Sequence, residues 1–510
     1  MSSQDRSSLP GPEARRSEGY AEAEPARQII PAREDTGACA LSFAQQRLWL
    51  IDQIEPGLSL YNIGMAYRIR GDLDATKLQG ALTAVVTRHE VLRTTFPSRD
   101  GVPFQVGNPP VEVPLPRRSV TGATTEARDE EARRIAAEET RRPFRLDSDP
   151  MLRALLIEVQ EREYLLVLTI HHIAGDAWSN GILAREISEY YAAAIEHRPP
   201  RLKPLPIQYA DYALWQRGWL QGERLDRELA YWKQHLSGSP LELPLPAARP
   251  RPTVPRYAGR SIPFSLSEGL CREVRALGSQ LTATPFVVYL TALQLLLHRY
   301  TDEADIPVGI AVSGRLRVEL ENLVGFFINM LVIRADLSGN PTVEEAIARV
   351  RGVVLGGLEH QHLPFEVLVE KLNPERHRAR NPLFQVALTY YSDSRSALRL
   401  PGAEVIPESV GGGKAKFDWT VSVGQTKTGA RCSFGYDLDL YSDGVMQRAV
   451  GHWINVLSGM CGNPGRRISD LRLLPPEERR RVISIYNQTS RPYPRRCIHA
   501  LVEERARETP

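Results

Sequence analysis

The sequence has few of the patterns that mark disulfide-rich, zinc-binding or membrane proteins. Only five of the 510 residues are cysteine, and they are scattered, with no CxxC pair among them. This scatter excludes a disulfide framework and zinc-ligand spacing, and it fits a reduced, cytoplasmic setting. No apolar run reaches the roughly 20 residues that a membrane-spanning helix needs. Residues 1–28 also lack the apolar core of a secretory signal.

An excess of charge of either sign is also missing. Lys and Arg number 64, Asp and Glu number 61, and the formal net charge is +3. Such a balance gives no electrostatic footprint for a nucleic acid or an anionic membrane, so we expect neither as a partner. The composition, 42% hydrophobic and 25% charged, is that of a packed globular protein. A chain of this length exceeds the size at which one core stops growing, so two or more lobes are expected.

Helical and strand patterns alternate on both sides of a proline-rich break at 198–216. Before the break, the spacing predicts helices over 42–54, 74–96 and 180–197 and strands over 66–73 and 163–170. After it, the patterns predict helices over 225–238 and 285–301 and strands over 304–315 and 329–337. Asp74 is expected to cap its helix, and Pro285 suits a first helical turn. The mixture predicts an α/β protein of two lobes.

Two adjacent histidines, His171 and His172, follow the apolar strand 163–170, in a chain with only 11 histidines. The near-continuous hydrophobicity of that strand indicates burial on both faces. Residues 171–177 then fill a strand-to-helix loop, a common place for chemistry. Because neighbouring residues in extended chain point to opposite sides, the two rings are poorly placed to bind one metal ion. No HExxH pattern or cysteine set supports such a site either.

Spacing alone leaves two interpretations of the histidine pair open. One is a packed, hydrogen-bonded side chain at a strand end. The other is a proton-transfer group, because the unperturbed pKa of histidine lies near about 6.5. In the second case Asp176 would hold the loop, by capping the next helix or by pairing with an arginine.

Seven segments, in order, resemble the motifs of nonribosomal peptide synthetase condensation domains. HHIAGDAWS (171–179) is similar to the HHxxxDxxS core of that family. The other six are LSFAQQRLW (41–49) followed by YNI (61–63), RHEVLRTTF (88–96), QYADYALWQ (208–216), VSGRLRVELENLVGFFINMLVIR (312–334), HQHLPFEVLVEKL (360–372) and RNPLFQVALTY (380–390). The resemblance covers nearly all of residues 39–470. Residues 473–510 resemble a linker that runs into the first residues of an adenylation domain.

The resemblance implies an α/β fold of two chloramphenicol acetyltransferase-like lobes, arranged as a V-shaped pseudo-dimer with a central tunnel. It divides the chain into a disordered lead-in (1–38), an N-terminal lobe (39–215), a C-terminal lobe (216–470) and a linker with the truncated start of an adenylation domain (471–510). Donor and acceptor are expected from opposite faces, each as a thioester on the phosphopantetheine arm of a peptidyl carrier protein. The downstream adenylation domain of the same synthetase is a further expected partner. The domain itself is expected to be monomeric and to bind neither a cofactor nor a metal.

The motif implies roles for the loop residues. His172 is expected to face the reacting centre, either removing a proton from the acceptor amine or holding the amine and steadying the tetrahedral intermediate. His171 and Asp176 are expected to be structural. Ser179 is expected to cap the next helix. Gly175 is expected either to keep the loop small beside the pantetheine arm or to be a simple turn glycine.

Further roles follow from the family. Its aspartate pairs with an arginine, for which Arg315 is the first candidate and Arg93 the second. The residues expected to line the tunnel are Gly175, Trp178, Ser313 and Asn329. Ala177 stands where many relatives carry glycine, and its methyl group is expected to narrow that spot and to tolerate a positive φ less well.

The implied reaction is amide formation, for which several subclasses remain. AQQRLW with YNI is most similar to domains that join an L-configured donor to an L-configured acceptor. A starter domain that attaches a fatty acyl group to the first amino acid is the alternative. The chain begins at a methionine with only a short lead-in, which fits either a starter or a protein that receives its donor from another synthetase protein. A non-catalytic recruitment domain of the same fold is disfavoured by the intact motif. A free-standing acyltransferase is disfavoured by the adenylation linker. The side chains of donor and acceptor are not readable from the sequence.

Overall fold

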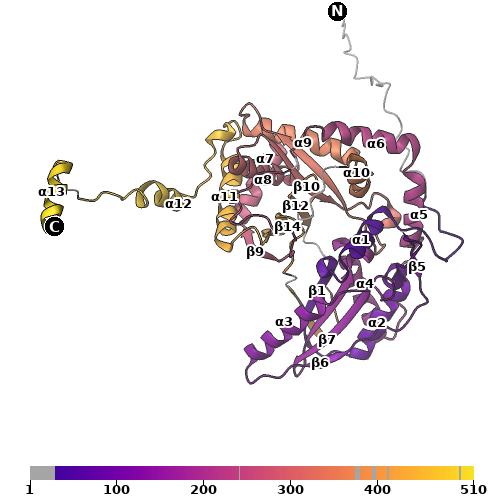
Figure 1. The fold of residues 1–510 in the computed structure, drawn as a ribbon. Coiled ribbons are helices and arrows are strands. Elements are labelled where there is room, and N and C mark those ends of the chain that lie inside the picture. Colours follow the sequence, from indigo (N-terminus) through magenta and orange to yellow (C-terminus); the bar gives the residue numbers. More distant parts are fainter. Residues whose placement is uncertain are drawn as a thin grey trace, which may run out of the picture.

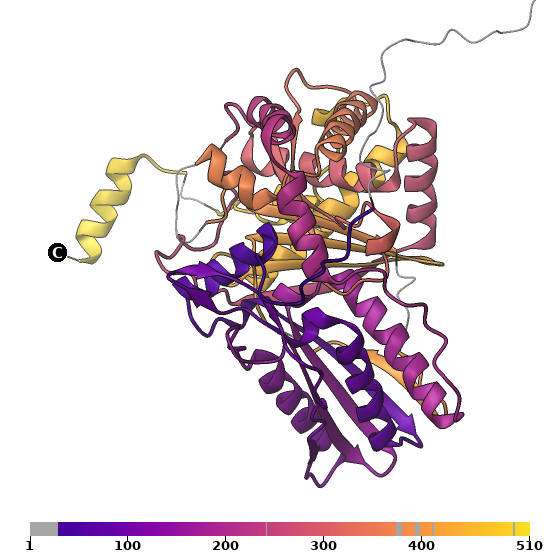
Figure 2. The same ribbon diagram turned by 90° about the vertical axis from the view of Figure 1, so that its right-hand side faces the viewer.

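The computed structural model describes residues 29–509, apart from 241, 374–379, 393–397, 411–412 and 493–494. It shows two parts, each built on one mixed β-sheet with helices packed against it (Figures 1 and 2). The predicted lead-in, 1–38, lies outside the described residues as far as residue 28. The predicted boundaries after residues 215 and 470 stay predictions.

The first sheet has five strands around a buried centre. Their order is β13 (Ala403–Glu408), β1 (Asn62–Gly71), β8 (Glu163–His171), β7 (Leu152–Gln160) and β6 (Arg117–Ser119). β8 is antiparallel to both neighbours, and Tyr164 is its only residue that is not buried. α3 (Thr125–Arg141) covers one face, while α2 (Ala75–Arg88) and α4 (Ala177–Ile195) pack on the other. The buried strand predicted before the histidine pair is therefore confirmed.

The second sheet has six strands and carries the larger core. Their order is β11 (Asn329–Asp336), β10 (Asp305–Val312), β12 (Val386–Ser392), β14 (Trp419–Thr426), β15 (Gly429–Asp437) and β9 (Gly259–Leu266). The helices that share its core include α7 (Glu268–Gln280), α8 (Pro285–Thr301), α9 (Val343–Glu359) and α11 (Asp443–Gly462). α8 has the predicted bounds, with Pro285 in its first turn, and it is buried along most of its length.

Shorter elements connect or border the two sheets. The helices among them are α1 (Phe43–Ile54), α5 (Tyr209–Trp219), α6 (Gly222–His235), α10 (Phe365–Leu372), α12 (Pro476–Arg480) and α13 (Ile498–Glu508), and single turns lie at η2 (Ser59–Tyr61), η3 (Glu90–Arg93), η4 (His172–Ala174), η5 (Val318–Leu320), η6 (Ile468–Asp470) and η7 (Arg481–Ile485). Two small ribbons pair β2 (Thr94–Thr95) with β5 (Val106–Gly107) and β3 (Ser98–Arg99) with β4 (Val102–Pro103). α12 and α13 extend away from the body of the molecule (Figure 1).

One strand crosses between the two parts. β13 follows β12 of the second sheet in sequence, yet it pairs antiparallel with β1 at the edge of the first sheet. Figure 2 shows this orange strand beside the purple ones. Arg68 on β1 is 4% exposed and forms ion pairs with Glu408 on β13 and with Glu163 on β8. The two parts are thus interlocked rather than joined end to end.

Two predicted elements need correction. The helix expected over 74–96 ends at Arg88, because the backbone of His89 is extended and a single turn and a short strand follow. The capping of this helix by Asp74 is confirmed. The break expected over 198–216 contains the start of α5, because Gln208 and Asp211 form a capping box that outweighs the prolines before it.

Among the described residues, no single helix has the length and apolar composition to cross a membrane. Only α7 and α8 taken together pass that test, and the break between them bends by 102°.

Candidate active site

The two histidines lie at the end of β8, where the chain turns away from the sheet. His171 is the last residue of the strand and is 4% exposed. Its Nδ1 accepts a hydrogen bond from the N–H of Ile173 at 3.2 Å, and its ring meets Phe144 edge-on at 5.8 Å. Burial, helped by the positive charges of Lys416 and Arg153, lowers the pKa of His171 to about 3. A neutral, fully packed imidazole at this position holds the turn.

His172 begins the η4 turn and has a different environment. Its ring contacts Phe326 edge-on at a centroid distance of 4.7 Å, and Tyr61 lies 6.5 Å away on another side. Its Nδ1 is buried without a hydrogen-bond partner among the described residues. Burial first, and then the positive charge of Lys416, holds the pKa of His172 well below its usual value. The imidazole is therefore neutral near pH 7 and can accept a proton.

Asp176 anchors the loop that carries His172. It is the N-cap of α4, and its Oδ1 accepts the N–H of Ser179 at 2.8 Å. Arg315 donates to both of its oxygens, at 2.7 Å and 3.1 Å, and both side chains are almost completely buried. The carboxylate thus makes both of the contacts considered for it from the sequence, the cap and the arginine pair.

Ser179 is not the helix cap expected from the sequence. It lies inside the first turn of α4, where its hydroxyl donates to Asp176 at 2.9 Å and accepts the N–H of Gly325 at 3.1 Å. The N–H of Phe327 also donates to Asp176, at 3.2 Å. The histidine loop is therefore tied to the segment between β10 and β11.

The glycine before Arg315 permits this approach. Gly314 has φ 65°, a conformation that favours glycine. A Cβ there would lie 2.0 Å from the carbonyl oxygen of Phe327. Arg93, the second candidate partner of Asp176, lies elsewhere, with its Nε and Nη1 unpartnered among the described residues and with Glu90 and Arg33 as its charged neighbours.

Gly175 and Ala177, the two small residues of the motif, are explained by different features of the structure. A Cβ at Gly175 would lie 2.7 Å from Cδ1 of Ile170, so the glycine makes room for the core rather than for a turn. Its φ of −169° is ordinary extended backbone. Ala177 is the exposed first residue of α4 and has no positive φ, so the cost expected there does not arise.

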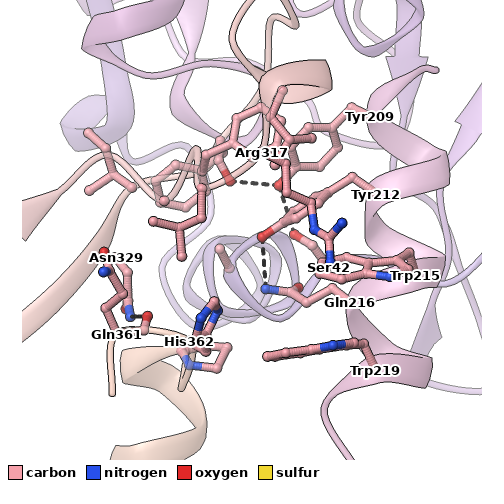
Figure 3. Close-up of a pocket in the computed structure, with 18 of the residues that line it drawn as sticks. Ser42, Tyr209, Tyr212, Trp215, Gln216, Trp219, Arg317, Asn329, Gln361 and His362 are labelled. Atoms are coloured by element: carbon pink, nitrogen blue, oxygen red, sulfur yellow. Dashed lines mark hydrogen bonds between the residues drawn. The ribbon is translucent and has the colours of Figure 1, made fainter. Parts of the chain in front are cut away.

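A cavity of about 260 Å³ is bounded in part by the segment between β10 and β11 (Figure 3). The residues that line it come from both sides of the molecule: Ser42, Ala44, Tyr209, Tyr212, Trp215, Gln216, Trp219, Gly314, Leu316, Arg317, Leu320, Phe326, Phe327, Ile328, Asn329, Gln361, His362, Pro364 and Glu366. Tyr209 donates to the carbonyl of Phe326 at 2.6 Å and shares a hydrogen bond with Ser42 at 3.0 Å. Because Phe326 also contacts His172, this wall of the cavity adjoins the imidazole.

Aromatic rings form another wall. Trp215 stacks with Trp219 at 5.4 Å, His362 faces Trp219 at 4.9 Å, and the guanidinium of Arg317 lies 4.6 Å above Trp215. Figure 3 shows Trp215 and Trp219 across the cavity from Asn329, with His362 between them. The cavity is thus bounded by large, mostly apolar surfaces with a few polar groups, as ligand pockets usually are.

Only one of the four residues expected to line a tunnel lines this cavity. Asn329 does so, while its amide group also donates to the carbonyls of Gln361 and Leu363 at 3.0 Å and 2.8 Å. Gly175, Trp178 and Ser313 are not among the lining residues. Trp178 is 50% exposed, and its indole N–H donates to the carbonyl of Glu321 at 2.9 Å. These three lining roles stay predictions.

Lys416 is a charged neighbour of the histidines that the sequence interpretation missed. Its Nζ lies 5.0 Å from the ring centre of Tyr61. Burial, together with the charge of Arg47, lowers the pKa of Lys416 to about 8. In the sequence it is one lysine in AKFDW (415–419), with nothing to separate it from a surface lysine. Within the described part of the chain, no cluster of three or more His, Cys, Asp or Glu is arranged to hold a metal ion.

The match to known families agrees with this geometry. The family model described as "Condensation domain" matches residues 36–483. The chain belongs to the condensation-domain family. The proposed resemblance to condensation domains of nonribosomal peptide synthetases is confirmed, and so is the α/β fold of the chloramphenicol acetyltransferase type.

Curated relatives of this condensation domain are large synthetases. It is 41% identical over 485 residues to a linear gramicidin synthase protein of Brevibacillus parabrevis, covering 94% of this chain and 10% of the relative. It is 36% identical over 487 residues to phosphinothricin tripeptide synthetase PhsC of Streptomyces viridochromogenes, covering 94% of this chain and 45% of the relative. The chain therefore spans less than half the length of either of these relatives.

Solved structures similar to this condensation domain include different members of the fold. The X-domain from teicoplanin biosynthesis is 29% identical with a TM-score of 0.80, covering 88% of this chain and 100% of that one. The four-domain synthetase holo-AB3403, bound to AMP and glycine, is 24% identical with a TM-score of 0.83, covering 92% of this chain and 36% of that one.

Proposed function

We propose that this condensation domain forms an amide bond between a carrier-bound acyl or peptidyl thioester and the amine of a carrier-bound aminoacyl thioester. The observation that carries the proposal is the placement of His172. Its ring lies just after β8 against Phe326, which lines the cavity, and the buried Asp176–Arg315 pair holds its loop. Burial keeps the pKa of the imidazole below its usual value. A group of this kind can accept a proton from an attacking amine.

The proposed reaction needs one group that accepts the amine proton and later releases it to the leaving thiolate. The lone pair of the acceptor amine forms the C–N bond, and the π electrons of the thioester carbonyl move to its oxygen. The amine proton passes to His172. The tetrahedral intermediate then collapses with cleavage of the C–S bond, and the leaving thiolate takes the proton. An α-amino group has a pKa near about 8, so part of it is already neutral, and positioning contributes much of the rate.

The cavity supports a site for one of the two substrate arms. We propose that it admits the phosphopantetheine arm of a carrier protein, because its lining reaches Phe326, which contacts His172. Donor and acceptor peptidyl carrier proteins and an adenylation domain of the same synthetase are the proposed partners. The domain itself is proposed to hold no cofactor.

The proposed subclass joins an L-configured donor to an L-configured acceptor. The sequences AQQRLW (44–49) and YNI (61–63) support this subclass. A starter role, with a fatty acyl donor, is the competing subclass. Incubation with acyl-CoA or with an acyl-carrier donor, followed by mass spectrometry of the acceptor carrier, separates the two.

Replacement of the imidazole tests the proposal. We expect His172→Ala to lower the rate of amide formation by about 10²-fold or more, because the proton acceptor is lost. The rate is measured with loaded donor and acceptor carriers by mass spectrometry. The matched control is His499→Ala, which removes an exposed histidine on α13 and should leave the rate unchanged. A wild-type rate in His172→Ala would overturn the assignment.

A non-catalytic recruitment domain is the second candidate function. It is favoured by the likeness to the X-domain, one solved structure of which is a complex with OxyB from teicoplanin biosynthesis. For this chain it predicts that the wild type transfers no acyl group between any loaded carriers. An active wild type excludes it.

A further inference from the structure

Lys416 is fixed next to the histidine loop by its own backbone. The side-chain amide of Asn381 donates to its carbonyl, and the N–H of Ala415 donates to the carbonyl of Tyr257 at 2.9 Å. The next residue, Phe417, packs on Phe384 at 5.3 Å. The ammonium therefore extends from a segment just before β14 that these contacts hold in place.

The direction of the side chain is set by an aromatic ring. The Nζ lies 5.0 Å from the ring centre of Tyr61, and that ring in turn meets the ring of His172 edge-on at 6.5 Å. The ammonium of Lys416 is thus a neighbour of the Tyr61 ring, and the Tyr61 ring is a neighbour of the His172 imidazole. The cation reaches this site from the second sheet, whereas the other two come from the first part of the chain.

The charge of Lys416 is not balanced by a carboxylate in the part of the chain that the structure describes. Among the described residues, Lys416 forms no hydrogen bond or ion pair through its Nζ. Arg47, whose charge acts on Lys416, is itself paired with Glu366 at 3.1 Å. The other titratable or charged groups around the ammonium, its aromatic neighbour and the histidine pair are Glu55, Tyr257, His171 and Arg153. A partly buried, uncompensated cation is costly, and such groups gather at functional sites.

We propose that Lys416 is a second functional side chain of the acyl-transfer site and that its ammonium stabilises the oxyanion formed on the donor carbonyl. The proposal rests on the function proposed above. When the amine attacks, the π electrons of the carbonyl move to oxygen, and a preorganised positive charge lowers the energy of that state. When the C–S bond breaks, the electrons return to re-form the C=O bond, and Lys416 keeps its own proton throughout.

The same charge adds to burial in lowering the pKa of His172. A positive neighbour disfavours protonation of an imidazole, and this effect adds to that of burial. Because the pKa of Lys416 is about 8, the ammonium loses its proton as pH rises above that value. The rate should therefore fall on the alkaline side, after rising as the acceptor amine becomes neutral.

Two substitutions at one position test the proposal. Lys416→Met keeps the chain length and removes the charge, and we expect it to lower amide formation by about 10²-fold. Its midpoint of thermal unfolding should equal or exceed that of the wild type, because a buried charge is gone. Lys416→Arg keeps a cation that does not titrate, so it should retain more activity than Lys416→Met and lose the alkaline fall of the rate. Lys414→Met, two residues away and exposed, is the matched control and should behave as the wild type.

A second readout needs no substrate. Titration of the His172 imidazole by NMR in the isolated chain should show a higher pKa in Lys416→Met than in the wild type. An unmoved pKa, or a wild-type rate in Lys416→Met, would overturn the role of Lys416. If His172→Ala is inactive while Lys416→Met is fully active, this inference alone fails. If the wild type transfers no acyl group, the proposed function fails. The titration then still shows whether the charge of Lys416 lowers the pKa of His172.

Discussion

At the residue scale, the two adjacent histidines have different environments, although only one peptide bond separates them. His171 ends the strand and points into the core against Phe144. His172 starts the turn and lies between Phe326 and Tyr61. Neighbouring side chains of an extended chain point to opposite sides, so one ring is committed to packing and the other is left for the proton transfer that we propose.

The burial of His171 predicts a stability that depends on pH. Its pKa is about 3 in the folded protein and about 6.5 in the unfolded chain. Between these values the unfolded state binds the extra proton, so the free energy of unfolding falls as pH falls from about 7 toward 3. Above about 7 this contribution is fully present. We expect His171→Asn to show a shallower fall, by up to about 1.4 kcal/mol per pH unit.

Urea unfolding at a series of pH values between 4 and 8 measures this slope. The control is His499→Asn, whose exposed side chain on α13 should leave the slope of the wild type unchanged. An equally steep fall in His171→Asn would mean that other groups cause the acid sensitivity.

At the element scale, the junction of β8, η4 and α4 depends on a missing side chain. We expect Gly175→Ala to destabilise the fold by about 1–3 kcal/mol, because its Cβ would press on Cδ1 of Ile170, which is fully buried. Ile170→Val removes that methyl group at a cost of about 0.5–1.5 kcal/mol by itself. The double variant should be more stable than the sum of the two changes. Chemical denaturation of all four proteins measures the coupling, and strict additivity would contradict the contact.

At the scale of the whole molecule, β13 should make the two parts unfold together. Glu408→Lys places a cation against the buried Arg68 and should weaken the pairing of β13 with β1. We expect a single calorimetric transition in the wild type and two separated transitions in this variant. Glu404→Lys changes an exposed residue of the same strand and should keep the single transition. Two transitions already in the wild type would show that the strand does not couple the parts.

The sequence by itself determined the features that depend on neighbouring residues. The bounds of α8, the buried strand before the histidines and the Asp74 cap follow from local spacing. The order of the motifs was enough for the family, because each motif is a short run of adjacent residues. Local patterns also misled where a cap or a turn overrode them, as at Arg88 and Gln208.

Only the tertiary structure decided which distant side chains meet. Arg315 rather than Arg93 reaches Asp176, 139 residues away in the chain, and Lys416, from the segment before β14, lies over the ring of Tyr61, which contacts His172. Nothing local distinguishes these cations from exposed ones. The partners of both cations, and the lowered pKa of Lys416, depend on burial and on charges that folding brings together, and these exist only once the two sheets are interlocked.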